Sequence, residues 1–148
     1  MIPMKLFQSQ VADWMTREPV TVASTASLAE AYNLMEDQGV RRLPVVDRGV
    51  VRGIVTLSDI LRVIPLIGED GDRETRLMMS TRRVSDVMTY DPVTVQSEDT
   101  LLDVAERMLE YQVSGLPVRD GQRLVGIITE SDIFRLVIEA LSEADVEE

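Results

Sequence analysis

The chain repeats itself once, at a fixed offset of 73 residues and without a gap. VADWMTREPVTV, from Val11, aligns with VSDVMTYDPVTV, from Val84, and GIVTLSDILR aligns with GIITESDIFR. Over residues 11–62 and 84–135, 23 of 52 aligned positions are identical. This degree of self-similarity indicates a duplication, so we expect both copies to adopt the same fold.

Each copy predicts the same order of secondary structure, because turn residues and apolar spacing recur at matched positions. We expect short helical turns at residues 11–15 and 84–88, a strand at each PVTV, and helices at residues 28–38 and 101–111. The candidate N-caps of these helices are Ser24 or Ser27 and Ser97 or Thr100. A hairpin follows, with its turn at Arg48-Gly49 in the first copy and at Gly121-Gln122 in the second. The second strand of each hairpin is a nearly continuous apolar run, which predicts that it is buried. A final helix is expected near Ser58 or Ser131, and in the second copy it extends through Leu141.

The predicted fold class is therefore α/β (α+β), with two β-α-β-β-α repeats. Each repeat has about 55 residues, which is small for an independent core, so the copies should pack on each other about a pseudo-twofold axis. The expected boundaries are a leader at 1–10, repeat 1 at 11–65, a linker at 66–83, repeat 2 at 84–139 and an acidic tail at 140–148. Around Leu77 the linker is rich in arginine and is compatible with a short amphipathic helix.

Composition excludes several classes of function. The chain has no Cys and no His, which removes disulfides, thiolate nucleophiles, imidazole bases and Cys/His metal sites. The net charge of −11 argues against nucleic-acid binding, although the linker arginines form a local basic patch. No run is long and apolar enough for a membrane span, and the N-terminus does not resemble a secretory signal, so we expect a cytoplasmic protein with no metal.

The chemically most informative motif is Thr-x-Ser-Asp, which occurs at residues 56–59 and 129–132, where a strand gives way to a helix. One interpretation is helix capping by the serine and the aspartate. The other is ligand binding, because Ser and Thr hydroxyls can donate to a phosphate, whereas an ionised Asp only accepts and suits the two hydroxyls of a ribose. Both can hold at once.

In this arrangement the repeated motifs (W/V)MT, PVTV, LPV and GI(V/I)T-x-SD resemble the CBS domain, named after cystathionine β-synthase, as a tandem pair. The resemblance covers about residues 11–63 and 84–137. It implies that the two repeats pack through their sheets and form two clefts in which adenosine-containing ligands often bind. It also implies that two pairs associate into a homodimer of four repeats.

The resemblance implies ligand contacts at three kinds of position. These are the Thr-x-x-Pro loops with the following strand, the residues before each LPV, and the Thr-x-Ser-Asp motifs. One implied cleft joins Thr16, Pro19, Thr21, Val40, Arg41 and Arg42 to Thr129, Ser131 and Asp132. The other joins Thr89, Pro92, Thr94, Val113, Ser114 and Gly115 to Thr56, Ser58 and Asp59.

Some of these positions also have a purely structural interpretation. The Thr-x-x-Pro loops are compatible with simple turns, and a pair of arginines is compatible with a solvated face or a salt bridge. Arg41 and Arg42 are forked cations suited to phosphate, so we expect the first cleft to prefer AMP, ADP or ATP. The second cleft lacks local positive charge and should hold a less anionic ligand or none.

The function that this pattern favours is a regulatory sensor of an adenine nucleotide, with no catalytic residue and no required cofactor. The alternative is an adaptor that dimerises and docks on a separate protein without a ligand. In either case the regulated partner would be a separate effector protein. Candidate dimer contacts on the final helices are Ile60, Leu61, Ile64, Ile133, Leu136, Val137 and Ile138.

Overall fold

The computed structural model describes residue 6, residues 8–64 and residues 71–147. Most of the predicted leader, Pro65, linker residues 66–70 and Glu148 lie outside the described residues. The chain forms two compact units that do not coincide with the two sequence repeats. Unit 1 comprises Met1–Pro19 and Val93–Glu148, and unit 2 comprises Val20–Pro92.

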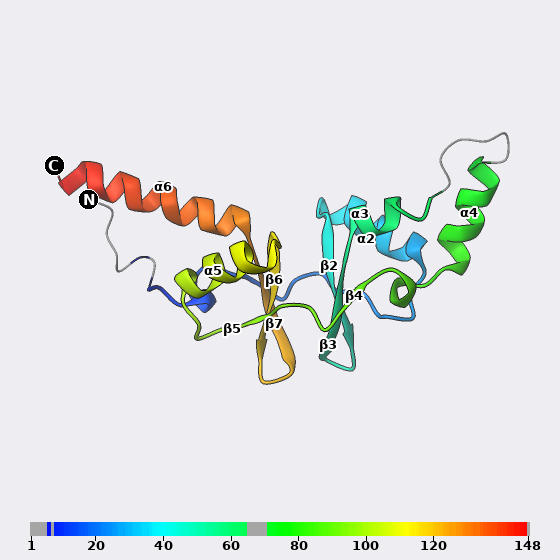
Figure 1. The fold of residues 1–148 in the computed structure, drawn as a ribbon, viewed down its shortest axis with the longest axis horizontal. Coiled ribbons are helices and arrows are strands. Elements are labelled where there is room, and N and C mark those ends of the chain that lie inside the picture. The colour runs from blue at the N-terminus through cyan, green and yellow to red at the C-terminus, as the bar shows by residue number, and fades with distance from the viewer. Residues whose placement is uncertain (1–5, 7, 65–70, 148) are drawn as a thin grey trace. The chain divides into compact units, whose positions relative to one another are not determined.

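Unit 1 contains most of the second repeat together with the first segment of the first repeat. Its elements are η1 (Val11–Asp13), β1 (Thr16–Arg17), β5 (Val95–Gln96), α5 (Leu101–Tyr111), β6 (Gly115–Asp120), β7 (Arg123–Thr129) and α6 (Glu130–Glu147). β6 pairs with β7 in an antiparallel hairpin and with β5 in parallel, while β1 adds to the other edge of β7. Figure 1 shows α5 and α6 beside this hairpin.

Unit 2 is built in the same way from the first repeat and the first segment of the second. Its elements are α2 (Leu28–Gln38), β2 (Arg42–Asp47), β3 (Val50–Thr56), α3 (Leu57–Leu61), α4 (Gly71–Thr81), η2 (Val84–Asp86) and β4 (Thr89–Tyr90). β2 and β3 form an antiparallel hairpin, and β4 pairs with β3 on the side away from β2. The mixed α+β fold class is thereby confirmed.

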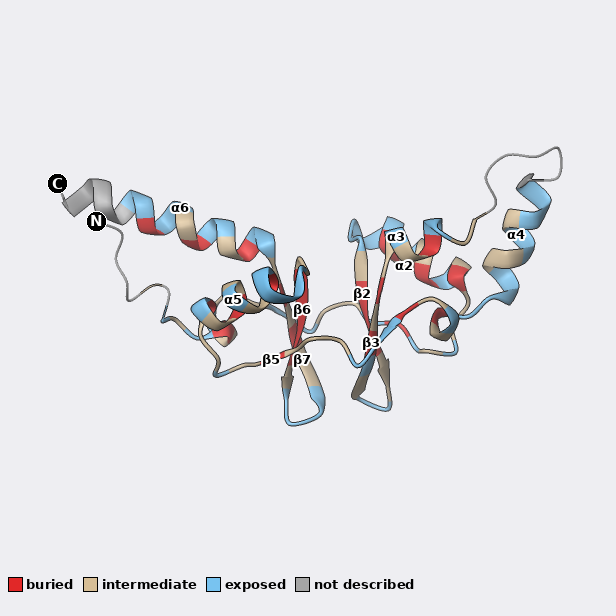
Figure 2. Ribbon diagram, viewed as in Figure 1, coloured by how far each residue is buried: buried red, intermediate tan, exposed pale blue. Residues whose placement is uncertain are grey.

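Each unit has its own hydrophobic core, and each core includes a residue from the exchanged segment. Val11 is fully buried among residues of the second repeat that include Val118 and Leu136. Val84 is fully buried in the core of unit 2, with Leu43 and Ile60. In Figure 2 the buried residues concentrate on the hairpin strands and on the helix faces that pack against them.

The local sequence signals predicted most element boundaries. α2 and α5 span the predicted residues, and their N-caps are Ser27 and Thr100, whose side chains accept hydrogen bonds from the backbone of the first turn. Both hairpin turns lie where predicted, with left-handed backbone at Arg48, Gly49 and Gly121. The linker helix is confirmed as α4, which packs on α2.

Two predictions about elements are wrong. The first PVTV forms no strand and makes a single bridge, from Val22 to Val45, and of the second PVTV only Val95 lies in a strand, β5. The strands β1 and β4 instead lie just before each Pro, because they pair with the edges of β7 and β3. The second hairpin strand is only partly buried, with Arg52 exposed. The final helix of the second copy extends through Leu141 as predicted, and α6 continues to Glu147.

Candidate functional site

In unit 2 the Thr-x-Ser-Asp motif lies where β3 leads directly into α3. Thr56 is the N-cap, and its Oγ1 accepts a hydrogen bond from the Asp59 N–H at 3.2 Å. Asp59 Oδ2 in turn accepts from the Thr56 N–H at 2.9 Å. The other carboxylate oxygen of Asp59 lies 3.4 Å from the guanidinium of Arg62. The predicted N-cap, Ser58, is therefore wrong, because Ser58 lies inside the first turn of α3 and is exposed.

The equivalent motif in unit 1 is more tightly enclosed. Asp132 Oδ2 accepts from the Thr129 N–H at 2.8 Å and from the Thr129 hydroxyl at 3.4 Å, and its Oδ1 pairs with Arg135. Among the described residues, Asp132 is the one buried charged side chain, at 2% exposed. Ser131 is exposed and, like Ser58, lies in the first turn rather than at the cap. Thr56 therefore caps α3, whereas in unit 1 only the bond from the Thr129 N–H to Asp132 resembles a cap, and both arrangements leave the ligand interpretation open.

The Thr-x-x-Pro loops lie beside the second hairpin strand of their unit. Thr16 pairs with Ile127 in β7, and Thr89 pairs with Ile54 in β3. Both threonines are exposed. The loop of each repeat therefore packs beside the strand that leads to the other repeat's Thr-x-Ser-Asp motif.

The residues before each LPV lie beside the same junctions. The Arg41 carbonyl accepts a hydrogen bond from the N–H of Leu57, the first residue of α3, at 2.8 Å, and Arg42 pairs with Thr56. In unit 1 the Ser114 carbonyl accepts from the Glu130 N–H at 3.0 Å, and Gly115 pairs with Thr129. The backbone arrangement is therefore equivalent, whereas the side chains differ completely.

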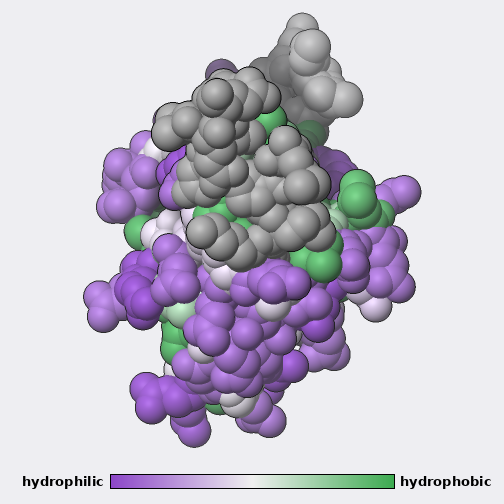
Figure 3. All heavy atoms as spheres, turned by 90° about the vertical axis from the view of Figure 1, so that its left-hand side faces the viewer, coloured by the Kyte–Doolittle hydropathy of each residue, from purple (hydrophilic) through white to green (hydrophobic). Residues whose placement is uncertain are grey.

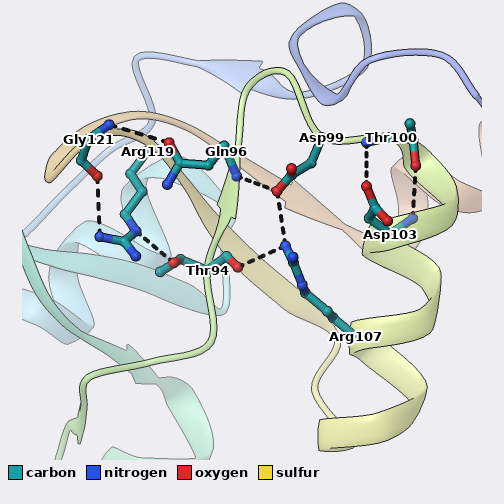
Figure 4. Close-up of polar contacts among 8 residues, drawn as sticks. All are labelled: Thr94, Gln96, Asp99, Thr100, Asp103, Arg107, Arg119 and Gly121. Atoms are coloured by element: carbon teal, nitrogen blue, oxygen red, sulfur yellow. Dashed lines mark hydrogen bonds and ion pairs between the residues drawn. The ribbon is translucent and has the colours of Figure 1, made fainter.

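Thr94 lies in a polar network that has no counterpart in the first repeat (Figure 4). Arg119 Nε donates to Thr94 Oγ1 at 2.8 Å, and Arg107 donates to the Thr94 carbonyl at 3.3 Å and to Asp99 at 3.0 Å. The positions aligned with Arg107 and Arg119 are Leu34 and Val46, which cannot make such bonds.

This network corrects the expectation that the second predicted set lacks local positive charge, since two guanidinium groups contact Thr94. Sequence reasoning missed both arginines because they lie outside the motifs. Comparison of the copies could have found them as charged residues at positions that are apolar in the first repeat.

The structure brings together parts of both predicted clefts within each unit. Unit 1 holds Thr16, Pro19, Thr94, Val113, Ser114, Gly115, Thr129, Ser131 and Asp132. Unit 2 holds Thr21, Val40, Arg41, Arg42, Thr56, Ser58, Asp59, Thr89 and Pro92. Each predicted cleft therefore draws residues from both units, and the two clefts stay predictions.

The CBS domain family model matches residues 11–66 and 84–139, which are the two copies of the internal repeat. The chain belongs to the CBS domain family. Solved CBS domain pairs have the same fold. The domain pair of protein MJ0100, in complex with 5′-methylthioadenosine and S-adenosyl-L-methionine, is 30% identical with a TM-score of 0.72, over 87% of this chain and 95% of that one. CBSX2 from Arabidopsis thaliana, in complex with AMP, is 28% identical with a TM-score of 0.75, over 88% and 97%.

Relatives include both small CBS proteins and longer enzymes. The CBS domain-containing protein YhcV of Bacillus subtilis is 33% identical over 84% of this chain and 83% of its own length. L-aspartate semialdehyde sulfurtransferase of Methanocaldococcus jannaschii is 32% identical over 90% of this chain, which spans only 24% of that enzyme. The matched region is therefore a minor part of the enzyme, and the similarity does not assign the enzyme's activity to this chain.

The described residues contain no group of three or more acidic side chains placed to hold a metal ion. Nowhere in the described part of the chain does a helix combine the length and the apolar character needed to cross a bilayer.

Proposed function

We propose that this CBS domain pair is a regulatory module that binds an adenosine-containing nucleotide of the AMP, ADP or ATP class. Two related pairs of known structure hold adenosine-containing ligands, AMP in one and 5′-methylthioadenosine with S-adenosyl-L-methionine in the other. The observation that carries the proposal is the Thr-x-Ser-Asp motif, which places a carboxylate at the end of the second hairpin strand in both units.

The chemistry of the motif suits a nucleoside. An ionised carboxylate accepts hydrogen bonds and repels phosphate, so Asp59 and Asp132 fit the two hydroxyls of a ribose. The exposed hydroxyls of Ser58 and Ser131 can donate to a phosphate or to a sugar oxygen. The nucleotide is a regulatory ligand and not a cofactor, and the module itself is not catalytic.

A thermal-shift screen of the full chain with AMP, ADP, ATP, S-adenosylmethionine and NAD tests the proposal. A ligand at about 100 times its Kd adds about 2.7 kcal/mol to the free energy of unfolding, which raises Tm by roughly 5–11 °C for a chain of this size. We expect at least one adenine nucleotide to give such a shift, and guanosine monophosphate serves as the control. If no adenosine compound changes Tm, the ligand-free adaptor is the better account.

We also propose that two copies associate as a homodimer of four repeats that acts on a separate effector protein. The exposed apolar face of α6 supports this, because Phe134, Ile138 and Leu141 recur at spacings of four and three residues and are 60%, 64% and 47% exposed. Two of the contacts expected from the sequence are wrong, since Ile60 and Leu136 are fully buried in the cores. On the face drawn in Figure 3, apolar areas interrupt a mainly hydrophilic surface.

A further inference from the structure

The linker helix α4 carries a basic stripe on the side that faces away from α2. The helix packs on α2, and its half-buried Met79 lies against the core of unit 2. The opposite side of α4 is exposed, as Figure 2 shows. We call this side the α4 stripe, and its members, which recur at spacings of three and four residues and so share one helix face, are Arg73, Arg76, Leu77 and Ser80.

The two arginines of the α4 stripe are available to a partner. Arg73 makes no hydrogen bond or ion pair with any described residue. Within the described part of the chain, Arg76 makes a single hydrogen bond, to the carbonyl oxygen of Asp72 at 3.4 Å. By contrast, Arg83, which follows the helix, donates to the Thr25 carbonyl. The guanidinium groups of the stripe can therefore bind an incoming anion without first breaking an ion pair.

An exposed apolar side chain accompanies these two charges. Leu77 is 61% exposed, so a partner that covers it gains free energy from the burial of apolar surface. Residues 71–83 hold four arginines and two acidic residues, whereas the whole chain has a net charge of −11. The stripe is therefore a small basic and apolar surface on an acidic molecule, and this local charge favours an acidic partner.

The α4 stripe is separate from the parts of the chain that define the family. The CBS domain model matches residues 11–66 and 84–139, and α4 lies outside both ranges. The stripe shares no residue with the Thr-x-Ser-Asp motifs or with the exposed face of α6. At the repeat offset of 73 residues, Arg76 aligns with Pro3, so the first copy does not carry the same charge. The surface is therefore a feature of this chain and not of the repeated unit.

We propose that the α4 stripe is the docking site for the separate effector protein, and that the docking segment is an acidic amphipathic helix. This inference rests on the effector partner of the proposed function, but it does not require a bound nucleotide. Two carboxylates three residues apart on the partner match the spacing of Arg73 and Arg76, and each can form forked, charge-assisted hydrogen bonds with a guanidinium. An apolar residue on the same face of the partner covers Leu77.

Two other anionic partners fit the α4 stripe less well. An anionic membrane repels a chain with a net charge of −11, and one exposed leucine buries too little apolar area to hold a helix at a lipid surface. A nucleic acid needs several phosphate contacts, and the stripe supplies only Arg73 and Arg76. A protein segment can bind through a few charge pairs around one apolar contact.

Fluorescence anisotropy with the full chain and a labelled peptide tests the proposal. The probe is a helical peptide in which glutamates three residues apart share a face with leucine, and a peptide of the same composition in scrambled order is its control. We expect the ordered peptide to bind, and the double variant Arg73→Glu/Arg76→Glu to weaken binding about tenfold or more. Leu77→Ser should weaken it about fivefold. Arg123→Glu reverses the charge of an exposed arginine in unit 1 and should leave the affinity within about twofold.

The outcomes separate this inference from the proposed nucleotide binding. Equal affinity for the ordered and scrambled peptides, equal effects of the double variant and Arg123→Glu, or no binding at about 1 mM peptide would overturn the docking site. Binding to phosphatidylglycerol vesicles that the double variant abolishes would assign the stripe to a lipid surface and overturn the proposal. Loss of the dimer in the double variant, measured by light scattering, would assign it to a second copy with the same consequence.

The peptide titration contains no nucleotide, so a negative thermal-shift screen would overturn nucleotide binding and leave the docking site standing. Conversely, a failed peptide titration leaves the nucleotide screen unaffected. A melting curve of each variant without peptide establishes that the chain is folded.

Discussion

At the scale of single residues, two glycines determine how closely the exchanged segments can approach the hairpins. A Cβ at Gly126 would lie 2.5 Å from Met15 Sδ and 2.8 Å from the Thr16 carbonyl oxygen. At Gly53, the matched position, it would lie 2.5 Å from the Thr89 carbonyl oxygen. Only a residue without a side chain lets the segment cross the strand at this distance.

We expect Gly126→Ala to lower the free energy of unfolding by about 1–3 kcal/mol, because the added methyl group overpacks a close backbone crossing. This corresponds to a loss of about 2–12 °C in Tm by scanning calorimetry. Gly53→Ala should cost more, since its nearest neighbour is backbone rather than a flexible methionine. Gly121→Asn is the control, because nothing lies within 4 Å of Gly121 and asparagine tolerates its left-handed backbone. A Gly126→Ala variant as stable as the parent would contradict the crossing.

The helix caps are features that a few neighbouring residues can predict. Ser27 and Thr100 were among the candidate caps, and both are confirmed. The alternative candidates, Ser24 and Ser97, instead donate to Asp47 and Asp120 across a separation of 23 residues. At the junction of α3, the three-residue spacing from Thr56 to Asp59 matches a capping box, a signal that would have favoured Thr56 over Ser58.

At the scale of elements, the identical PVTV segments differ by one residue of strand. Val95 pairs in parallel with Val118 and the pairing continues at Gln96 to form β5, whereas the matched Val22 makes a single parallel bridge to Val45. The network around Thr94 supplies a physical reason, since Arg119 and Arg107 tie the second segment to β6 and α5. The first copy has no such bonds, because Leu34 and Val46 stand at the aligned positions. A strand propensity common to both copies therefore could not predict this difference.

The hydrogen bonds at the N-terminus of α5 predict that the stability of the fold depends on pH. A hydrogen bond from the Thr100 backbone lowers the pKa of Asp103, with smaller lowering contributions from the Thr100 side chain and from Arg107. The pKa of Asp103 is lower in the folded chain than in the unfolded chain. Its carboxylate therefore stabilises the fold at a pH above the unfolded-state pKa, and this stabilisation is lost as the pH falls through the folded-state pKa.

Asp103→Asn keeps the cap geometry but removes the charge. We expect it to lower stability at pH 7 by about 0.3–1 kcal/mol, and the difference from the parent should disappear as the pH falls through the folded-state pKa of Asp103, as measured by urea unfolding at a series of pH values. Glu110→Gln, at the other end of the same helix, is the matched control and should be neutral or slightly stabilising at pH 7. A stability difference between Asp103→Asn and the parent that stays constant with pH would refute this role for Asp103.

At the scale of the whole molecule, the two sequence repeats exchange their first segments. Val11 belongs to the first repeat but is buried in the core of unit 1, and Val84 belongs to the second repeat but is buried in that of unit 2. Neither repeat alone therefore contains all the residues of one core. This exchange also places Thr16 and Thr89 beside the strands that lead to Asp132 and Asp59.

The proposed homodimer is a prediction at this scale. Light scattering should give the parent twice the 16.6 kDa mass of one chain, and Ile138→Glu should shift it to the monomer, because a charge on an exposed apolar face disfavours burial. Leu77→Glu on α4 changes a side chain of similar exposure in unit 2 and should leave the dimer intact. A monomeric parent at micromolar concentration would show that the face of α6 does not bind a second copy.

The sequence alone established the duplication, the bounds of α2 and α5, the hairpin turns and the two Thr-x-Ser-Asp motifs, because each depends on a pattern of neighbouring residues. Only the tertiary structure showed which half each first segment joins, which charges surround Thr94, and that Asp132 is enclosed while Arg41 is exposed. These features depend on contacts between distant parts of the chain. The two copies carry the same motifs at matched positions, so the local pattern cannot specify which copy a segment will pack against.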